Sequence, residues 1–293
     1  MSIDPQTLLD WFDANARDLP WRHADCTPWG VLVSEIMLQQ TPVARVLPVW
    51  RQWMERWPKP ADLAAASQGE VLRAWGKLGY PRRALRLHTA ANTIVAEHGG
   101  EVPADVDTLL SLPGIGAYTA RAVAAFAYGR RAPVVDTNVR RVVARAVHGA
   151  AEAGPPSTKR DLDDVEALLP DGPDEARAAR FSAALMELGA LVCIARKPRC
   201  DDCPLFADCA WQKAGRPAYT GPTRPTQRYS GTDRHVRGLL LDVLRGTTGP
   251  VEKAQLDLAW PKAGQRDACL ASLLSDGLVE QTADGRFALP GEH

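Results

Sequence analysis

Two acidic residues stand in settings where a carboxyl group could do chemistry. Asp136 directly precedes a helical stripe of apolar residues over 139–147, which predicts that it is the N-cap of a helix. The positive end of that helix is expected to keep Asp136 ionised. Glu35 lies in the apolar segment 31–38, where burial raises the pKa of a carboxyl group and suits it to general acid catalysis near neutral pH. The pattern at Asp136 also fits an ordinary helix cap, and the pattern at Glu35 also fits the polar face of an amphipathic helix.

A turn with two glycines precedes a second helical pattern. Gly114 and Gly116 follow Pro113, and Gly129 is expected to end the helix that begins after them. Glycine permits a sharp turn and the close approach of another group. Here it leaves the N–H groups at a helix N-terminus uncovered, which is an arrangement that binds phosphate. An ordinary helical hairpin fits the same spacing.

Four cysteines lie within seventeen residues, with the spacing C-x6-C-x2-C-x5-C. They are Cys193, Cys200, Cys203 and Cys209. Four thiolates so close together predict a metal site, and the number of ligands alone leaves zinc and an iron–sulfur cluster equally open. Cys26 and Cys269 lie outside this pattern and are expected to be ordinary thiols.

The composition indicates a globular protein without a membrane segment. The chain has 293 residues, of which 45% are hydrophobic, and its 35 basic residues balance its 35 acidic ones. No run approaches the 18 apolar residues of a membrane span, and the N-terminus lacks a signal-peptide pattern. We therefore expect a cytoplasmic protein, associated with the nucleoid only through DNA, in which disulfides do not form.

At zero net charge, binding to nucleic acid must depend on local basic clusters. Three candidates are Arg82, Arg83 and Arg86; Arg140, Arg141 and Arg145; and Arg196, Lys197 and Arg199. Any one cluster of this kind is more often a solvated face than a binding site.

The pattern of elements predicts a mainly α fold with a small second domain. Helical periodicity dominates up to about residue 230. Residues 214–233 are rich in Pro, Gly and Thr and are predicted to link a helical domain, 1–213, to a small domain, 234–293. Three helical patterns and a hairpin turn signal at 283–285 make this second domain resemble a winged helix of α+β type.

Several of these stretches together resemble the helix-hairpin-helix DNA glycosylase superfamily with an iron–sulfur cluster, and in particular its MutY family of adenine glycosylases. The resemblance rests on LPGIGAYTA at 112–120, VVDTNV at 134–139, SEIMLQQT at 34–41 and the spacing of the cysteines. It covers about residues 5–212 and implies two packed helical subdomains with a helix-hairpin-helix at about 108–128. It also implies that the four cysteines hold a [4Fe–4S] cluster.

The resemblance assigns roles to individual residues. Glu35 corresponds to the acid that protonates N7 of adenine, and Asp136 to the carboxylate that stabilises positive charge on the sugar. Tyr118 and Asn138 are implied to position this pair. The bifunctional branch of the superfamily has a lysine at the position of Tyr118, so the resemblance implies a monofunctional enzyme. The residues implied to contact substrate or DNA are Trp21, Arg22, Leu38, Gln39, Gln40, Thr41, Leu78, Gly79, Tyr80, Gly114, Gly116 and Glu187.

The implied function is base excision repair. The expected reaction is hydrolysis of the N-glycosidic bond of adenine mispaired with 8-oxoguanine or guanine in duplex DNA, by a monomer that flips the nucleotide out of the helix. Two alternatives are a thymine or uracil mismatch glycosylase on the same scaffold and a non-catalytic iron–sulfur DNA-binding regulator. The presence of both Glu35 and Asp136 argues against the regulator.

The chain departs from the family pattern at three places. Pro81 stands where a second tyrosine is usual, and Thr137 where glycine is usual. Residues 234–293 do not resemble the larger Nudix-like domain at the C-terminus of many MutY proteins.

Reading of the base opposite adenine is therefore expected to depend on the N-terminal groups, with Leu78 and Tyr80 as a wedge between bases. In the small domain, Arg234, Arg237 and Arg266 are available for phosphate contacts, which position a protein without reading sequence.

Overall fold

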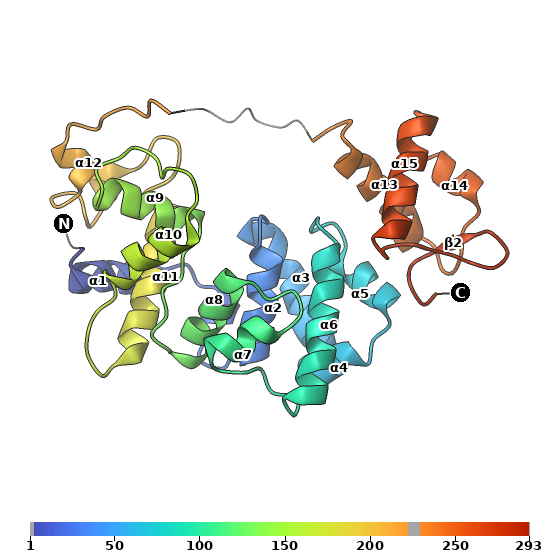
Figure 1. Ribbon diagram of the computed structural model, residues 1–293, viewed down its shortest axis with the longest axis horizontal. Helices are drawn as coiled ribbons and strands as arrows, with labels where there is room; N and C mark the ends of the chain where they lie inside the picture. The colour runs from blue at the N-terminus through green and yellow to red at the C-terminus, as the bar shows by residue number, and fades with distance from the viewer. Residues whose placement is uncertain (1–2, 222–228, 293) are drawn as a thin grey trace. The chain divides into compact units, whose positions relative to one another are not determined.

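The computed structural model describes residues 3–221 and 229–292, and helices account for most of its regular structure (Figure 1). The mainly α fold is therefore confirmed. None of the helices in these two ranges is both long and apolar enough to span a membrane. Part of the predicted linker, residues 222–228, lies outside the described residues.

Contacts between residues divide the described chain into two compact units that alternate along the sequence. The first unit contains residues 3–32, 104–111 and 115–221, and the second contains residues 33–103, 112–114 and 229–292. This division by contact differs from the predicted division by composition, because residues 229–292 group with residues 33–103. We refer to residues 229–292 as the C-terminal domain.

The first unit is built around one long helix. Its elements are α1 (Pro5–Asn15), η1 (Pro20–Arg22), the start of α2 (Pro28–Leu38), α7 (Val106–Ser111), α8 (Ala117–Tyr128), α9 (Thr137–Ala146), α10 (Thr158–Glu166), α11 (Glu175–Leu191), η2 (Cys200–Asp202) and α12 (Ala210–Lys213). Helix α11 contacts α1, α8 and α9. Its buried Phe181 and Leu188 share a core with Val142 of α9. A Cβ at Gly189 would lie 2.7 Å from the Cβ of Asn138, so glycine is what lets α9 and α11 approach.

The second unit joins helices from both ends of the chain. Its elements are the rest of α2, then α3 (Val43–Arg56), α4 (Pro60–Ala64), α5 (Gln68–Trp75), α6 (Arg82–Glu97), α13 (Asp233–Arg245), α14 (Lys253–Asp257), α15 (Ala263–Ser275), β1 (Glu280–Gln281) and β2 (Phe287–Ala288). Ser67 and Glu70 form the capping box that starts α5. Trp53 packs edge-on against Trp57 and Trp75, at centroid distances of 4.9 and 5.6 Å.

The C-terminal domain has the predicted three helices and hairpin. Strands β1 and β2 are antiparallel, with Glu280 opposite Ala288, and Gly285 in the turn has a φ of +84°. This domain also packs on α5 within the second unit. Arg73 of α5 makes two hydrogen bonds to the carboxylate of Glu292, at 2.7 and 2.6 Å. Such a paired contact holds both groups in a fixed orientation.

Candidate active site and cysteine site

Asp136 is the N-cap of α9, as its sequence position predicts. One carboxylate oxygen accepts a hydrogen bond from the backbone N–H of Val139 at 2.7 Å, and the other accepts one from the side-chain amide of Asn138, also at 2.7 Å. Burial raises the pKa of Asp136 above its usual value, although these two hydrogen bonds act to lower it. Desolvation thus opposes the stabilisation of the ionised form that the helix N-terminus provides.

Asn138 connects Asp136 to the region of the cysteines. Its side-chain oxygen accepts a hydrogen bond from Nη2 of Arg141 at 2.8 Å. Arg141 also donates to the carbonyl oxygens of Gly189 and Cys193, each at 2.6 Å. A single arginine thus holds the amide that orients Asp136 and the backbone of the first cysteine.

Glu187 is fully buried in α11, in contrast to the solvent-facing position usual for a lone glutamate. Its oxygens accept hydrogen bonds from the backbone and guanidinium of Arg17 at 2.8–2.9 Å and from Arg22 at 2.8 Å. Burial alone would raise the pKa of Glu187, but the hydrogen bonds from these two arginines lower it to about 2. Glu187 therefore fixes the loop that also carries the buried Trp21.

Tyr118 lies in the first turn of α8, at the end of the glycine turn. Its ring packs against a small buried cluster, and its hydroxyl is 4.0 Å from the sulfur of Met186. Gly116 is the N-cap of α8 and supplies no side-chain hydrogen bond. The glycine turn therefore leads directly into the N-terminus of α8, as the sequence predicts.

Gly114 belongs to the second unit. Its φ is +79°, and a Cβ on it would lie 2.7 Å from the Cβ of Arg86. Both observations require glycine at this position.

Glu35 is buried in α2, at 5% exposure, and Ser34 beside it is also buried. The end of this helix is held by Arg83, which donates to the carbonyl oxygens of Ile36 and Met37 at 2.8 and 3.1 Å. These carbonyls belong to the last turn of α2, where backbone acceptors lack partners inside the helix. Burial lowers the pKa of Arg83 to about 10, which still leaves it charged at neutral pH.

The residues after α2 change from buried to exposed within a short stretch. Leu38 and Gln39 are half-buried, and Gln40 is exposed. Thr41 is buried, and its hydroxyl accepts a hydrogen bond from Nη2 of Arg83 at 3.0 Å. The exposed Gln40 has a φ of +54°, which is a strained backbone conformation for a non-glycine residue.

The predicted wedge is the loop 77–80, named the wedge loop from here on. Leu78 is buried at 4% exposure, whereas Tyr80 is 39% exposed. Gly79 has a φ of +84°, and its carbonyl accepts hydrogen bonds from Trp75 and Arg83 at 2.9 and 3.0 Å. Of the two predicted wedge residues, Tyr80 is therefore the one whose side chain is accessible. The core position of Leu78 fits a supporting role.

Four cysteine side chains border one small, largely apolar hollow in the first unit. Arg145 lines the same hollow and donates to Sγ of Cys193 at 3.6 Å and to the carbonyl of Ile194 at 2.8 Å. Among the described residues, no three ligand side chains gather around a single point as one metal ion would require. Four cysteine thiols around one hollow match the donor set of an iron–sulfur cluster, which is held by four thiolates.

The structure distinguishes the three candidate basic clusters by the exposure of their members. Arg83 is buried against α2, and Arg141 and Arg145 are committed to the region of the cysteines. Arg196, Lys197 and Arg199 are exposed. Their cluster alone among the three candidates keeps every member exposed. The inward positions of Arg83, Arg141 and Arg145 were not predictable from the sequence, because the partners of an arginine are set by tertiary contacts.

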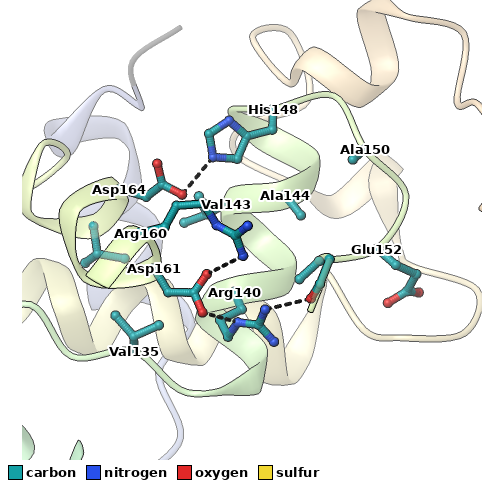
Figure 2. Close-up of a pocket in the computed structure, with 13 residues that line it drawn as sticks. Val135, Arg140, Val143, Ala144, His148, Ala150, Glu152, Arg160, Asp161 and Asp164 are labelled. Atoms are coloured by element: carbon teal, nitrogen blue, oxygen red, sulfur yellow. Dashed lines mark hydrogen bonds and ion pairs between the residues drawn. The ribbon is translucent and has the colours of Figure 1, made fainter. Parts of the chain in front are cut away.

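A hollow between α9 and α10 is lined by none of the predicted site residues. Figure 2 shows Arg140 and Arg160 directed at Asp161, with nitrogen–oxygen distances of 2.8 and 3.2 Å, and His148 paired with Asp164 at 3.0 Å. Burial acts to raise the pKa of Asp161, but hydrogen bonds from Ser157 and these arginines lower it. The charges of this hollow therefore compensate one another.

Comparison with known proteins identifies the family. The model of the HhH-GPD superfamily base excision DNA repair protein matches residues 33–166, and that of the iron-sulfur binding domain of endonuclease III matches residues 193–209. The chain is 65% identical over 293 residues to an adenine DNA glycosylase of Mycolicibacterium smegmatis, covering 100% of this chain and 98% of that one. Identity to an adenine DNA glycosylase of Mycobacterium tuberculosis is 60% over 291 residues, covering 99% and 94% of the two chains.

A solved structure of a thermostable thymine-DNA glycosylase shares the fold, with a TM-score of 0.64 and 29% identity over 72% of this chain and 95% of that chain. The protein carries a [4Fe–4S] cluster, and the iron–sulfur match falls on the four cysteines that border the hollow. Since relatives at 60–65% identity span essentially the whole sequence, the chain belongs to the MutY family of adenine DNA glycosylases.

Proposed function

We propose that this DNA glycosylase hydrolyses the N-glycosidic bond of adenine mispaired with 8-oxoguanine or guanine in duplex DNA. The observation that carries the proposal is the setting of Asp136. Its carboxylate is oriented by two neutral hydrogen-bond donors, Val139 and Asn138, in a partly desolvated position. Such a carboxylate keeps its ability to stabilise a positive charge that develops beside it.

In the proposed reaction, the bond between C1′ of the sugar and N9 of adenine breaks, and its electron pair leaves with the base. Glu35 gives a proton to N7 of adenine, which makes the base a neutral leaving group. Asp136 stabilises the oxocarbenium sugar until a water molecule adds to C1′ and releases a proton. This division between an acid and a charge-stabilising carboxylate follows the logic of glycosidases.

We assign the remaining residues by their exposure and place in the fold. The start of α8 at Gly116 suits a DNA phosphate, and the exposed Gln40 suits a base edge. Tyr118 offers no amine for a Schiff base, so the product is an abasic site in an unbroken strand. The cluster, when bound, ties together the loop that carries Arg196 and Lys197. We infer that the enzyme acts as a monomer.

The decisive experiment is single-turnover excision on duplexes that carry adenine, thymine or uracil opposite 8-oxoguanine, guanine or cytosine. Adenine opposite 8-oxoguanine or guanine is expected to be the substrate. Efficient release of thymine or uracil would support the second candidate, which the likeness to a thymine-DNA glycosylase favours. Binding to all duplexes without release of any base would instead indicate a regulator.

The acid is tested by Glu35→Gln, which keeps the size of the buried side chain and removes its proton donor. The excision rate is expected to fall by roughly 10²–10⁴-fold, while affinity for the mismatched duplex persists. Glu55→Gln, an exposed position on α3, is the matched control and should excise at the wild-type rate. A wild-type rate in Glu35→Gln would contradict the assignment.

A further inference from the structure

The C-terminal domain contacts the wedge loop directly through Arg234 in the first turn of α13. Nη1 of Arg234 donates to the hydroxyl of Tyr80 at 2.6 Å. The guanidinium carbon also lies 5.5 Å from the centre of the Tyr80 ring. A hydrogen bond from a charged group and a cation–π contact therefore act on the same side chain.

Arg234 is itself held by an aromatic cluster of the C-terminal domain. Its guanidinium lies 5.0 Å from the centre of the Tyr229 ring. Tyr229 packs on the ring of His235 at 5.1 Å, and His235 packs on Trp260 at 5.5 Å. The arginine is thus oriented before it meets Tyr80, so less side-chain freedom is lost in making the contact.

A second contact fixes the C-terminal domain beside the wedge loop. Asp276 accepts from Arg82 of α6 at 3.2 Å and from Arg237 of α13 at 2.6 Å. Arg237 is therefore engaged in an ion pair, and Arg266 donates to the carbonyl of Trp260 at 2.8 Å. Of the three arginines that the sequence offered for phosphate contacts, Arg234 is the one that touches a predicted DNA-binding residue.

Tyr80 needs such support because its own backbone is strained. Its φ is +47°, a conformation that non-glycine residues adopt at a cost, and proline follows it at position 81. Its ring is 39% exposed. Arg83 contacts the ring as well, at 5.5 Å, but Arg83 lies on α6, the helix that directly follows the wedge loop. Arg234 is the contact that the C-terminal domain adds.

We propose that Arg234 is a positioning residue for Tyr80 and that through it the C-terminal domain takes part in discriminating the base opposite adenine. This inference rests on the proposed function of the site. It adds a contribution of the C-terminal domain to the sequence-based expectation that recognition rests more heavily on the N-terminal groups. Tyr80 probes the duplex, and Arg234 sets the orientation in which its ring does so.

The test compares single-turnover adenine excision opposite 8-oxoguanine with excision opposite guanine, in the full chain. Arg234→Ala is expected to lower the ratio of the two rates by roughly three- to tenfold, which is the size of effect that such contacts have. Tyr80→Phe, which loses only the hydroxyl, should lower it less, and Arg234→Lys should restore part of it. In the double variant with Tyr80→Ala, Arg234→Ala should cause no further change, because it acts through Tyr80.

The matched control is Arg286→Ala, which removes an arginine of the C-terminal domain whose ion pair is with Asp284 in the hairpin turn. In Arg286→Ala, the ratio of the excision rates opposite 8-oxoguanine and opposite guanine should stay at the wild-type value. A merely structural loss lowers both rates together and leaves their ratio unchanged, so an unchanged ratio in Arg234→Ala overturns the inference. So does a further drop in the double variant.

A readout without catalysis separates this inference from the proposed function. 2-Aminopurine is placed next to the base opposite adenine, and its fluorescence rises when the wedge unstacks it. Arg234→Ala should reduce this rise, and Tyr80→Ala should abolish it. If the wild type excises no adenine, the proposed function fails, while the fluorescence still decides whether Arg234 positions Tyr80. A full rise in Arg234→Ala refutes the positioning role.

Discussion

Glu187 and Asp136 are two carboxylates of the first unit that differ in the charge of their partners. Glu187 receives its hydrogen bonds from the guanidinium groups of Arg17 and Arg22 and the backbone of Arg17. Asp136 receives its hydrogen bonds from a backbone N–H and from the neutral amide of Asn138. The pKa of Glu187 falls to about 2, whereas burial raises that of Asp136.

The charge of the hydrogen-bond partners distinguishes an acid with a structural role from an acid that can take part in chemistry. A carboxylate paired with two cations has its charge already compensated, so it responds weakly to a new positive charge nearby. A partly desolvated carboxylate with neutral donors remains poised to interact with a cation that forms beside it. We therefore propose that Glu187 holds a loop of the first unit and that Asp136 takes part in the reaction.

The largest expected effect is that of Asp136→Asn on the excision rate. Asparagine caps helices about as well as aspartate, so the start of α9 should persist and the melting temperature should change little. Loss of the negative charge should slow single-turnover excision by roughly 10²–10³-fold. Asp105→Asn is the control, since Asp105 caps the neighbouring α7 by accepting from the N–H of Thr108 at 2.8 Å. Wild-type activity in Asp136→Asn would show that the negative charge of Asp136 is not needed for the reaction, so that Asp136 would not differ in role from Glu187.

Glu187→Gln should show the opposite pattern, with a large effect on stability. It leaves Arg17 and Arg22 without a compensating charge, at a cost of roughly 2–4 kcal/mol in the free energy of unfolding. The melting temperature should fall by roughly 5–15 °C, while excision by the folded enzyme at low temperature changes far less. Glu175→Gln, on the exposed surface of α11, should melt within a few degrees of the wild type. Equal melting of both variants would show that Glu187 is not a structural acid.

The smallest effect should come from Asn138→Ala, which removes one donor to Asp136. The excision rate at neutral pH should fall by roughly tenfold or less. Because the hydrogen bond from Asn138 lowers the pKa of Asp136, its removal should raise that pKa further. Asp136 acts in its ionised form, so the loss of activity on the acid side should move to higher pH. Asn15→Ala, at the exposed end of α1, is the control, and an unshifted pH profile would exclude the positioning role of Asn138.

The position of Asp136 as a helix cap was predictable from the sequence because its cue is local, whereas the pattern around Glu35 fitted a buried acid and the polar face of a helix alike. Asp136 precedes an apolar stripe that marks a helix start, and Glu35 lies in an apolar run. The glycine turn, the capping box at Ser67 and the elements of the C-terminal domain follow from the same short-range rules. Each of these cues lies within a single helix, turn or hairpin, so no knowledge of the tertiary structure was needed.

The partners of the charged side chains were not predictable in this way. Arg83 and Arg141 occur in basic clusters that look solvent-exposed, yet their guanidinium groups bind backbone carbonyls of other segments. Glu187 meets Arg22 across 165 positions of sequence. The contact of Arg234 with Tyr80 spans 154 positions. Periodicity reports which face of a helix is buried and carries no information about which distant group lies opposite.

The alternation of the chain between its two units has a consequence for folding. Arg17 and Glu187 are 170 positions apart, and Arg73 and Glu292 are 219 apart. At the usual speed of translation, about 5–20 residues per second, α1 waits roughly 10–30 seconds on the ribosome before α11 exists to cover it. Contacts of such long separation also slow the search for the native topology. The nascent chain therefore exposes apolar helices for most of its synthesis, and chaperone occupancy on the ribosome is expected to be high until α11 has emerged.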